Sequence, residues 1–98
     1  MTDAATSLQA VGDRWALSGQ MTMDTAANLL EASTSLPLPQ AGVVDLERVG
    51  RFDSAGVSLL LAWKRRAAVE GKPLQFAGAP QSMVSLAMLY GVEDMLTA

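Results

Sequence analysis

The sequence predicts a single α/β domain (residues 1–98) with a mixed, mostly parallel sheet of four to five strands and about three helices. Short alternating or apolar stretches, typical of strands, take turns along the chain with longer stretches whose apolar residues recur every three or four positions, as in helices. Glycine and proline separate most of these stretches. The 98 residues, half of them hydrophobic, suffice for one buried core.

The first elements are predicted to be two antiparallel strands. Ser7–Val11 and Arg14–Ser18 both alternate in polarity, and Gly12-Asp13 between them is a turn signal. Gly19-Gln20 is expected to end the second strand.

A helix is predicted over Thr22–Leu36, with Thr22 or Asp24 as its cap. Pro37 and Pro39 end it, because proline disfavours helix in the residue before it. Val43–Leu46 then predicts a central parallel strand covered on both faces.

A loop over Glu47–Phe52 leads to the longest predicted helix, which begins at Asp53 or Ser54 and ends at Val69, with Gly71 as its stop signal.

Leu74–Ala77 predicts the next strand, and Pro80 opens a last helix that reaches Tyr90. Val92 and Leu96 in the tail are expected to pack on the domain. The order is therefore β-β-α-β-α-β-α, which favours right-handed crossovers between parallel strands.

Composition argues against most chemical functions. The chain has no cysteine and no histidine, which removes disulfides, zinc sites and the commonest general base. No glycine-rich phosphate-binding motif is present, so neither a cofactor nor an enzymatic activity is expected. The net charge of −3 argues against nucleic acid as a partner. No leader or membrane-spanning run is visible, so a cytoplasmic domain is expected.

Two carboxylates, Asp45 in the predicted strand Val43–Leu46 and Asp53 at the start of the long helix, could approach each other at the top of the sheet. If they met at one edge of the sheet, they would offer a weak Mg²⁺ site. The simpler interpretation, which we favour, is that Asp53 caps a helix and Asp45 accepts hydrogen bonds from loop amides.

The turn Asp53-Ser54-Ala55-Gly56 has two interpretations. Its first two side chains suit a helix cap, which is a common structural role. Alternatively, Ser54 presents its hydroxyl at the helix start as a contact or phosphorylation site, and Gly56 lets a partner approach the backbone.

The long predicted helix carries more apolar residues than one stripe can hold. Leu59 and Trp63 lie on a different flank from the main stripe. The stripe itself comprises Val57, Leu60, Leu61, Ala67 and Ala68. Either a neighbouring helix covers Leu59 and Trp63, or they form a protein-binding surface.

The chain resembles the STAS domain family, named after sulfate transporters and anti-sigma factor antagonists. The resemblance rests on Val43–Leu46, the Asp53–Gly56 turn and the element order, and it extends over nearly the whole chain. The stretch Leu86–Val92 is most similar to the MlaB-like STAS subunits of the Mla phospholipid ABC transporter. One departure is serine at position 54, where those subunits usually have threonine.

The resemblance implies a STAS fold and a non-enzymatic interaction module. Its partner would be the cytoplasmic ATPase of the transporter, which maintains outer-membrane lipid asymmetry, so contact with the membrane would be indirect. The alternative is an anti-sigma factor antagonist whose Ser54 is phosphorylated by a partner kinase. The expected partner-binding residues are Asp53, Ser54, Ala55, Gly56, Leu59, Trp63 and Arg66.

Overall fold

A computed structural model of the chain describes residues 6–89 and Gly91. In this part of the chain the sheet has four strands in the order β1-β2-β3-β4; β1 and β2 are antiparallel, and the other two pairs are parallel. The elements are β1 (Ser7–Val11), β2 (Arg14–Met21), α1 (Ala26–Thr34), β3 (Val43–Phe52), α2 (Ser54–Glu70), β4 (Gln75–Ala77) and α3 (Gln81–Leu89). The predicted order and the mixed sheet are confirmed.

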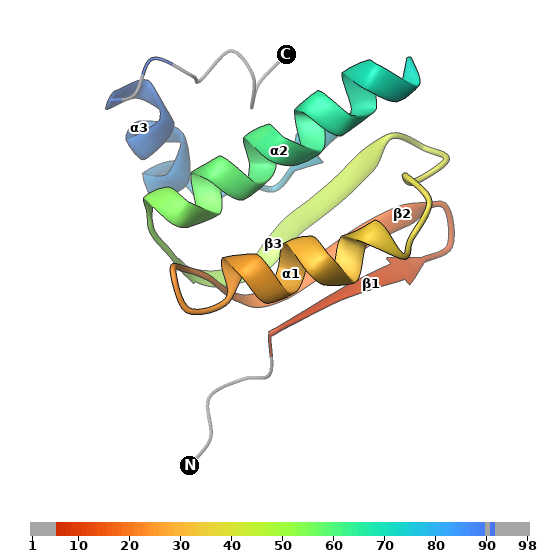
Figure 1. Cartoon of the computed structure of the whole chain (residues 1–98). Helices are drawn as coiled ribbons and strands as arrows, with labels where there is room; N and C mark the ends of the chain where they lie inside the picture. Colours follow the sequence, from red (N-terminus) through yellow and green to blue (C-terminus); the bar gives the residue numbers. More distant parts are fainter. Residues whose placement is uncertain (1–5, 90, 92–98) are drawn as a thin grey trace.

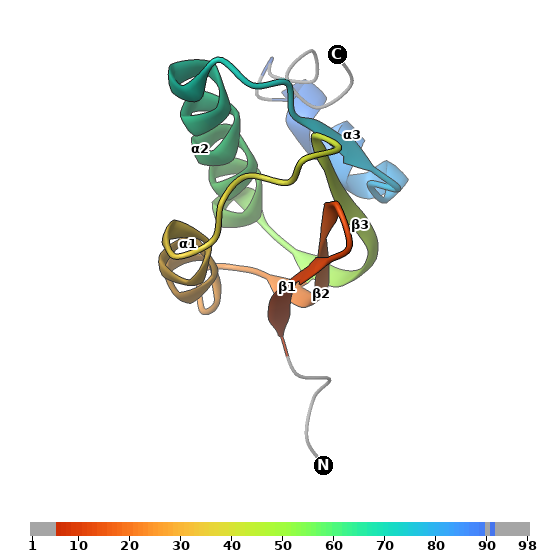
Figure 2. The ribbon, with the colours of Figure 1, turned by 90° about the vertical axis from the view of Figure 1, so that its right-hand side faces the viewer.

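The helices are unevenly distributed around the sheet. Figure 2 shows α1 and α2 next to each other on one side of β1, β2 and β3. Helix α3 lies beside the beginning of α2, which it contacts, and it buries Met83 and Ala87 (Figure 1). The face of the sheet toward α1 and α2 therefore carries the main core.

Two strands are longer than predicted. β2 continues past Ser18 to Met21, and the residues expected to form the loop Glu47–Phe52 belong to β3. The two ends pair, with Met21 opposite Phe52, and register shifts in the β2–β3 ladder absorb the additional residues of β3. Gly19 therefore lies within a strand, at φ 95°, a conformation that glycine adopts without steric cost.

Helix α1 is shorter than the predicted Thr22–Leu36. The residues before Ala26 form a separate turn, in which Thr25 Oγ1 donates to the Gln20 carbonyl oxygen (2.8 Å) and accepts from the Thr22 amide (3.0 Å). Thr25 precedes the first helical residue without capping it through its side chain, so the predicted caps, Thr22 and Asp24, are wrong.

The last predicted elements agree closely with the structure. β4 begins one residue later than the predicted Leu74, and α3 begins at Gln81, after Pro80. Tyr90, Val92 and Leu96 lie outside the described residues.

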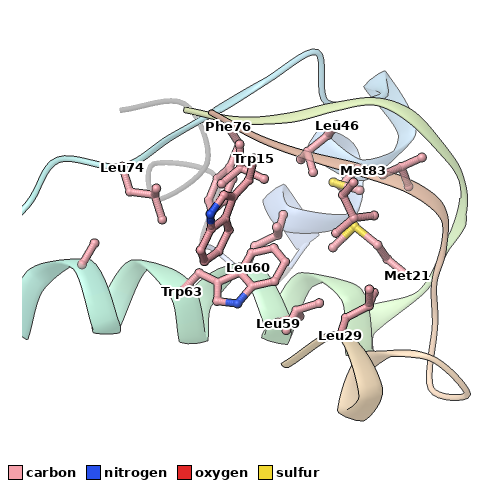
Figure 3. Close-up of a cluster of buried hydrophobic side chains, with 14 of the residues drawn as sticks. Trp15, Met21, Leu29, Leu46, Leu59, Leu60, Trp63, Leu74, Phe76 and Met83 are labelled. Carbon is pink, nitrogen blue, oxygen red and sulfur yellow. The ribbon is translucent and has the colours of Figure 1, made fainter. Parts of the chain in front are cut away.

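The core is organised around two tryptophans. Trp15 of β2 and Trp63 of α2 are each 1% exposed, and their rings meet edge to face with centroids 5.6 Å apart (Figure 3). Leu59 is 4% exposed. The sheet and α1 thus cover the second flank of α2, and the expectation that Leu59 and Trp63 form an exposed binding surface is wrong.

Ser33 links the two helices from inside this core. Its hydroxyl accepts a hydrogen bond from Trp63 Nε1 (2.9 Å) and donates one to the Leu30 carbonyl oxygen (2.6 Å). Arg66 adds a second link, because its guanidinium donates to the carbonyl oxygens of Ser33 (2.8 Å) and Leu36 (2.7 Å). These bonds satisfy buried polar groups and set the spacing of α1 and α2.

We predict that Trp63→Ala lowers the free energy of unfolding by about 3–5 kcal/mol, because it removes a buried indole and leaves the Ser33 hydroxyl without a donor. Urea denaturation followed by circular dichroism measures the change. The matched control is Val69→Ala, on the same helix but 88% exposed, which should change stability by no more than about 0.5 kcal/mol. A loss below about 1 kcal/mol for Trp63→Ala would contradict the packing described above.

Candidate functional site

Asp53 connects the end of β3, the start of α2 and the segment after β2. It has extended backbone angles (φ −141°, ψ −166°), and its Oδ1 accepts a hydrogen bond from the Ala55 amide (2.8 Å), as a helix cap does. Its Oδ2 accepts from the Met23 amide (3.0 Å), and its own amide donates to the Met21 carbonyl oxygen (3.1 Å). The predicted cap is confirmed, and it also holds the β2–α1 connection.

These hydrogen bonds lower the pKa of Asp53 below its ordinary value of 3.8. The hydrogen bond from the Met23 amide lowers this pKa most. Desolvation of the carboxylate raises the pKa in part, and the hydrogen bonds from the Ala55 and Gly56 amides lower it further. Asp53 is therefore ionised at neutral pH, where its charge suits the amino-terminal end of the helix.

Ser54 is the first residue of α2, and its side chain is exposed. Asp53 performs the capping, and among the described residues no side-chain hydrogen bond engages the Ser54 hydroxyl. The hydroxyl is thus available to a partner or to a modifying enzyme.

Gly56 has a structural role that differs from the one expected. It is buried, and a Cβ placed there would lie 2.5 Å from the Met21 carbonyl oxygen. The glycine therefore lets α2 approach the end of β2 within the domain. The expectation that it admits a partner is wrong.

A shallow groove of about 300 Å³ runs between α1 and α2 and begins beside the Ser54 turn. Its lining is apolar or small, with one hydroxyl side chain: Ala26, Ala27, Leu30, Ala55, Ser58, Leu59 and Ala62. Leu30 is 42% exposed, and Met23, whose amide binds Asp53, is 80% exposed. We call this surface, from Met23 and Ser54 to Ala62, the α1–α2 groove.

The predicted site residues therefore divide into two groups. Ala55 lines one end of the α1–α2 groove, Asp53 and Ser54 directly precede it in the chain, and the almost wholly buried Leu59 contributes to the lining. Gly56, Trp63 and Arg66 hold the domain together instead: Trp63 is buried, and Arg66 binds α1 and pairs with Glu70 (2.9 Å).

Sequence reasoning missed the contribution of α1 and of the segment before it. Met23, Ala27 and Leu30 are exposed near the Ser54 turn, although they lie far from it in the sequence. The available signal was the pair of small residues Ala26 and Ala27 within the predicted helix.

Asp45 and Asp53 do not form a common site, because β3 continues between them and places them near its opposite ends. Asp45 Oδ1 accepts from the Glu47 amide (2.9 Å), in line with the interpretation we favoured. A search of the described residues for three or more clustered metal-ligating side chains finds none.

A match to a family model shows which protein family the chain belongs to. The model described as "Mlab, STAS domain" matches residues 4–97, nearly the whole chain. The chain belongs to this MlaB-like STAS family. A search of the curated proteins finds no match.

Two solved structures are similar in fold to this STAS domain. It is similar to the anti-sigma factor antagonist SpoIIAA in its unphosphorylated form, with a TM-score of 0.58 and 18% identity over 86% of this chain and 83% of that one. It is also similar to a part of Mglu, with a TM-score of 0.54 and 29% identity over 76% of this chain. The STAS domain spans only 19% of the Mglu chain. Among the described helices, none has the length and apolarity needed to cross a membrane.

We predict a specific pH dependence for Asp53→Asn. Because the folded-state pKa of Asp53 is lowered, its ionised form stabilises the fold above the ordinary value of 3.8, and this contribution disappears as the pH falls through the lower folded-state pKa. The difference in unfolding free energy between wild type and Asp53→Asn should therefore shrink on acidification. Urea titrations across the acidic range measure it.

The control for this experiment is Ser58→Ala, which changes an exposed residue and keeps every carboxylate. Its stability should follow that of the wild type at each pH. A wild-type advantage over Asp53→Asn that stays constant into strong acid would show that the Met23 and Ala55 hydrogen bonds do not depend on the ionised carboxylate.

Proposed function

We propose that this STAS domain is a protein-binding module that docks on the cytoplasmic ATPase subunit of an Mla-type phospholipid ABC transporter. It would support assembly or activity of the complex, and thereby outer-membrane lipid asymmetry, with only indirect contact with the membrane. The family match supports this choice of partner. The observation that carries the proposal is the exposed Ser54 hydroxyl at the end of the α1–α2 groove.

The groove has the features of a helix- or loop-binding surface. Four of its lining residues are alanines, which let a partner backbone approach closely. Exposed Met23 and Leu30 supply apolar surface, worth about 25 cal/mol for each Å² removed from water. Methionine also adapts its shape to the partner. Ser54 and Ser58 add hydroxyls that orient the contact.

The domain acts by binding and not by catalysis. In the described part of the chain, the Ser54 hydroxyl has no hydrogen-bonded base, and the whole sequence has no histidine or cysteine to serve as one. A nucleophilic serine requires such a base. The lack of such a base supports the proposal that Ser54 acts as a contact residue.

The alternative function is that of an anti-sigma factor antagonist. A kinase would transfer a phosphoryl group from ATP to Ser54 Oγ, and the added charge would break the complex. The exposure of Ser54 is compatible with this reaction. The likeness to SpoIIAA, at 18% identity, supports the shared fold alone. We therefore place the transporter ATPase first.

We predict that an ABC ATPase and its permease co-purify with the affinity-tagged full chain from detergent extracts of its native cells. Mass spectrometry identifies the captured proteins. Capture of a sigma-regulating kinase without transporter subunits would reject the ATPase as partner and support the antagonist function.

We predict that Ser54→Glu weakens binding to the co-purified ATPase strongly, Ser54→Ala weakens it modestly, and Ser54→Thr leaves it nearly unchanged. Burying an unpaired carboxylate in an interface costs several kcal/mol, whereas loss of one hydroxyl contact costs about 0.5–1.5 kcal/mol. Threonine retains the hydroxyl. Isothermal titration calorimetry measures each affinity, and thermal melts should confirm that every variant folds.

Ser82→Glu is the matched control, because Ser82 is also an exposed serine in the first turn of a helix, α3. It should bind like wild type. Ala27→Arg tests the groove itself by placing a long charged side chain in it, and the exposed Ala68→Arg on α2 controls for the added charge. Wild-type affinity in both Ser54→Glu and Ala27→Arg would exclude the α1–α2 groove as the docking surface.

A further inference from the structure

Among residues 6–89, the outer edge of β1 lacks the charged residues and proline that usually protect an edge strand. β1 is the terminal strand of the sheet order, and its residues, Ser7–Val11, include no charged side chain and no proline. In an antiparallel pair, every second residue of the edge strand directs its N–H and C=O away from its neighbour. Natural proteins place charges, proline or bulges on such edges to prevent pairing with other chains.

The opposite edge of the sheet, at β4, is protected in the usual way. β4 has only three residues, and Pro73 lies just before it. Lys64 Nζ donates to the Leu74 carbonyl oxygen (2.5 Å), which places a cation at the start of this edge. Within the described residues, the edge of β1 therefore differs from the edge of β4, which is shorter and has a proline and a cation at its start.

The helix surface beside β1 is neutral as well. A hollow of about 160 Å³ lies between β1 and α1, and its lining residues are all uncharged: Thr6, Ser7, Leu8, Thr25, Asn28, Leu29 and Ala32. We call β1 and this hollow the β1 edge. The chain as a whole carries a net charge of −3, so the repulsion between two copies is weakest where uncharged surfaces meet. The β1 edge is such a surface.

We propose that the β1 edge binds a second copy of this chain, with the two β1 strands antiparallel about a twofold axis. An axis at Gln9, the middle residue of β1, places Gln9 opposite Gln9 of the copy and Leu8 opposite Ala10. This arrangement makes the edge self-complementary, as an isologous dimer requires. The two four-stranded sheets become one continuous sheet.

The side-chain directions fit this pairing. In the β1–β2 ladder, Leu8 lies opposite Leu17 and Ala10 lies opposite Trp15. Leu17 and Trp15 face the main core, so the side chains of Leu8 and Ala10 also lie on the side of the sheet that carries α1. The Leu8 and Ala10 side chains of the copy therefore lie against the hollow between β1 and α1. Gln9 is exposed on the opposite face of the sheet.

This dimer is independent of the proposed docking function and leaves its surface open. The α1–α2 groove uses Ala26, Ala27 and Leu30 of α1, whereas the β1 edge uses Asn28 and Ala32. At about 100° per residue these two sets lie on different sides of α1. Each copy keeps its groove free.

The test is the mass of the full chain by sedimentation velocity, from micromolar to near-millimolar concentration. Wild type should shift from monomer to dimer as the concentration rises. Gln9→Arg places two like charges directly opposite each other across the axis and should weaken the dimer about tenfold or more. Asn28→Arg adds a charge to the hollow and should act in the same direction.

The matched control is Gln75→Arg, an exposed glutamine on the β4 edge, which should dimerise like wild type. Circular dichroism should show that all variants remain folded. The proposal is overturned if wild type stays monomeric at every concentration. It is also overturned if Gln9→Arg and Asn28→Arg associate as strongly as wild type, or if Gln75→Arg alone abolishes the dimer.

Discussion

The contact between Trp63 and Trp15 holds the other parts of the domain in place, because it joins three elements at one point. The edge-to-face packing fastens α2 to β2 in the sheet, and the hydrogen bond from Trp63 Nε1 to Ser33 Oγ fastens α2 to α1. Arg66 of α2 adds hydrogen bonds to the carbonyl oxygens of Ser33 and Leu36, at the end of α1 and just after it. The width of the α1–α2 groove follows from these contacts, since neither helix can shift without breaking a buried hydrogen bond.

The Ser54 turn is a second point at which distant segments meet. β2 and β3 end side by side at Met21 and Phe52, so the helix that follows β3 starts against the chain that leaves β2. Asp53 binds the Met23 amide across this junction, and Gly56 lets the helix touch the Met21 carbonyl group. With Asp53 and Gly56 engaged inside the domain, Ser54 is the exposed residue of the turn, and Ala55 is half-buried in the lining of the groove. This division explains how a common helix-capping sequence also serves as a presented hydroxyl.

Helix α1 separates two surfaces of different chemistry. On one side are the apolar and small residues of the α1–α2 groove, and on the other is the neutral β1 edge with its backbone hydrogen-bonding groups. The first suits a side-chain contact with a partner of defined shape, and the second suits strand pairing. The two proposed partners, a transporter ATPase and a second copy of the chain, would therefore bind on different sides of α1.

The sequence by itself determined the element order, the mixed sheet and the cap at Asp53, because periodicity, turn residues and capping side chains act over a few neighbouring residues. Tertiary structure decided the length of β3, the burial of Trp63, the inward role of Gly56 and the contribution of Ala27 and Leu30 to the groove. Strand ends depend on pairing with a distant strand, and the burial of an apolar flank depends on which helix packs against it. Both result from contacts between segments far apart in the chain, which local patterns do not encode.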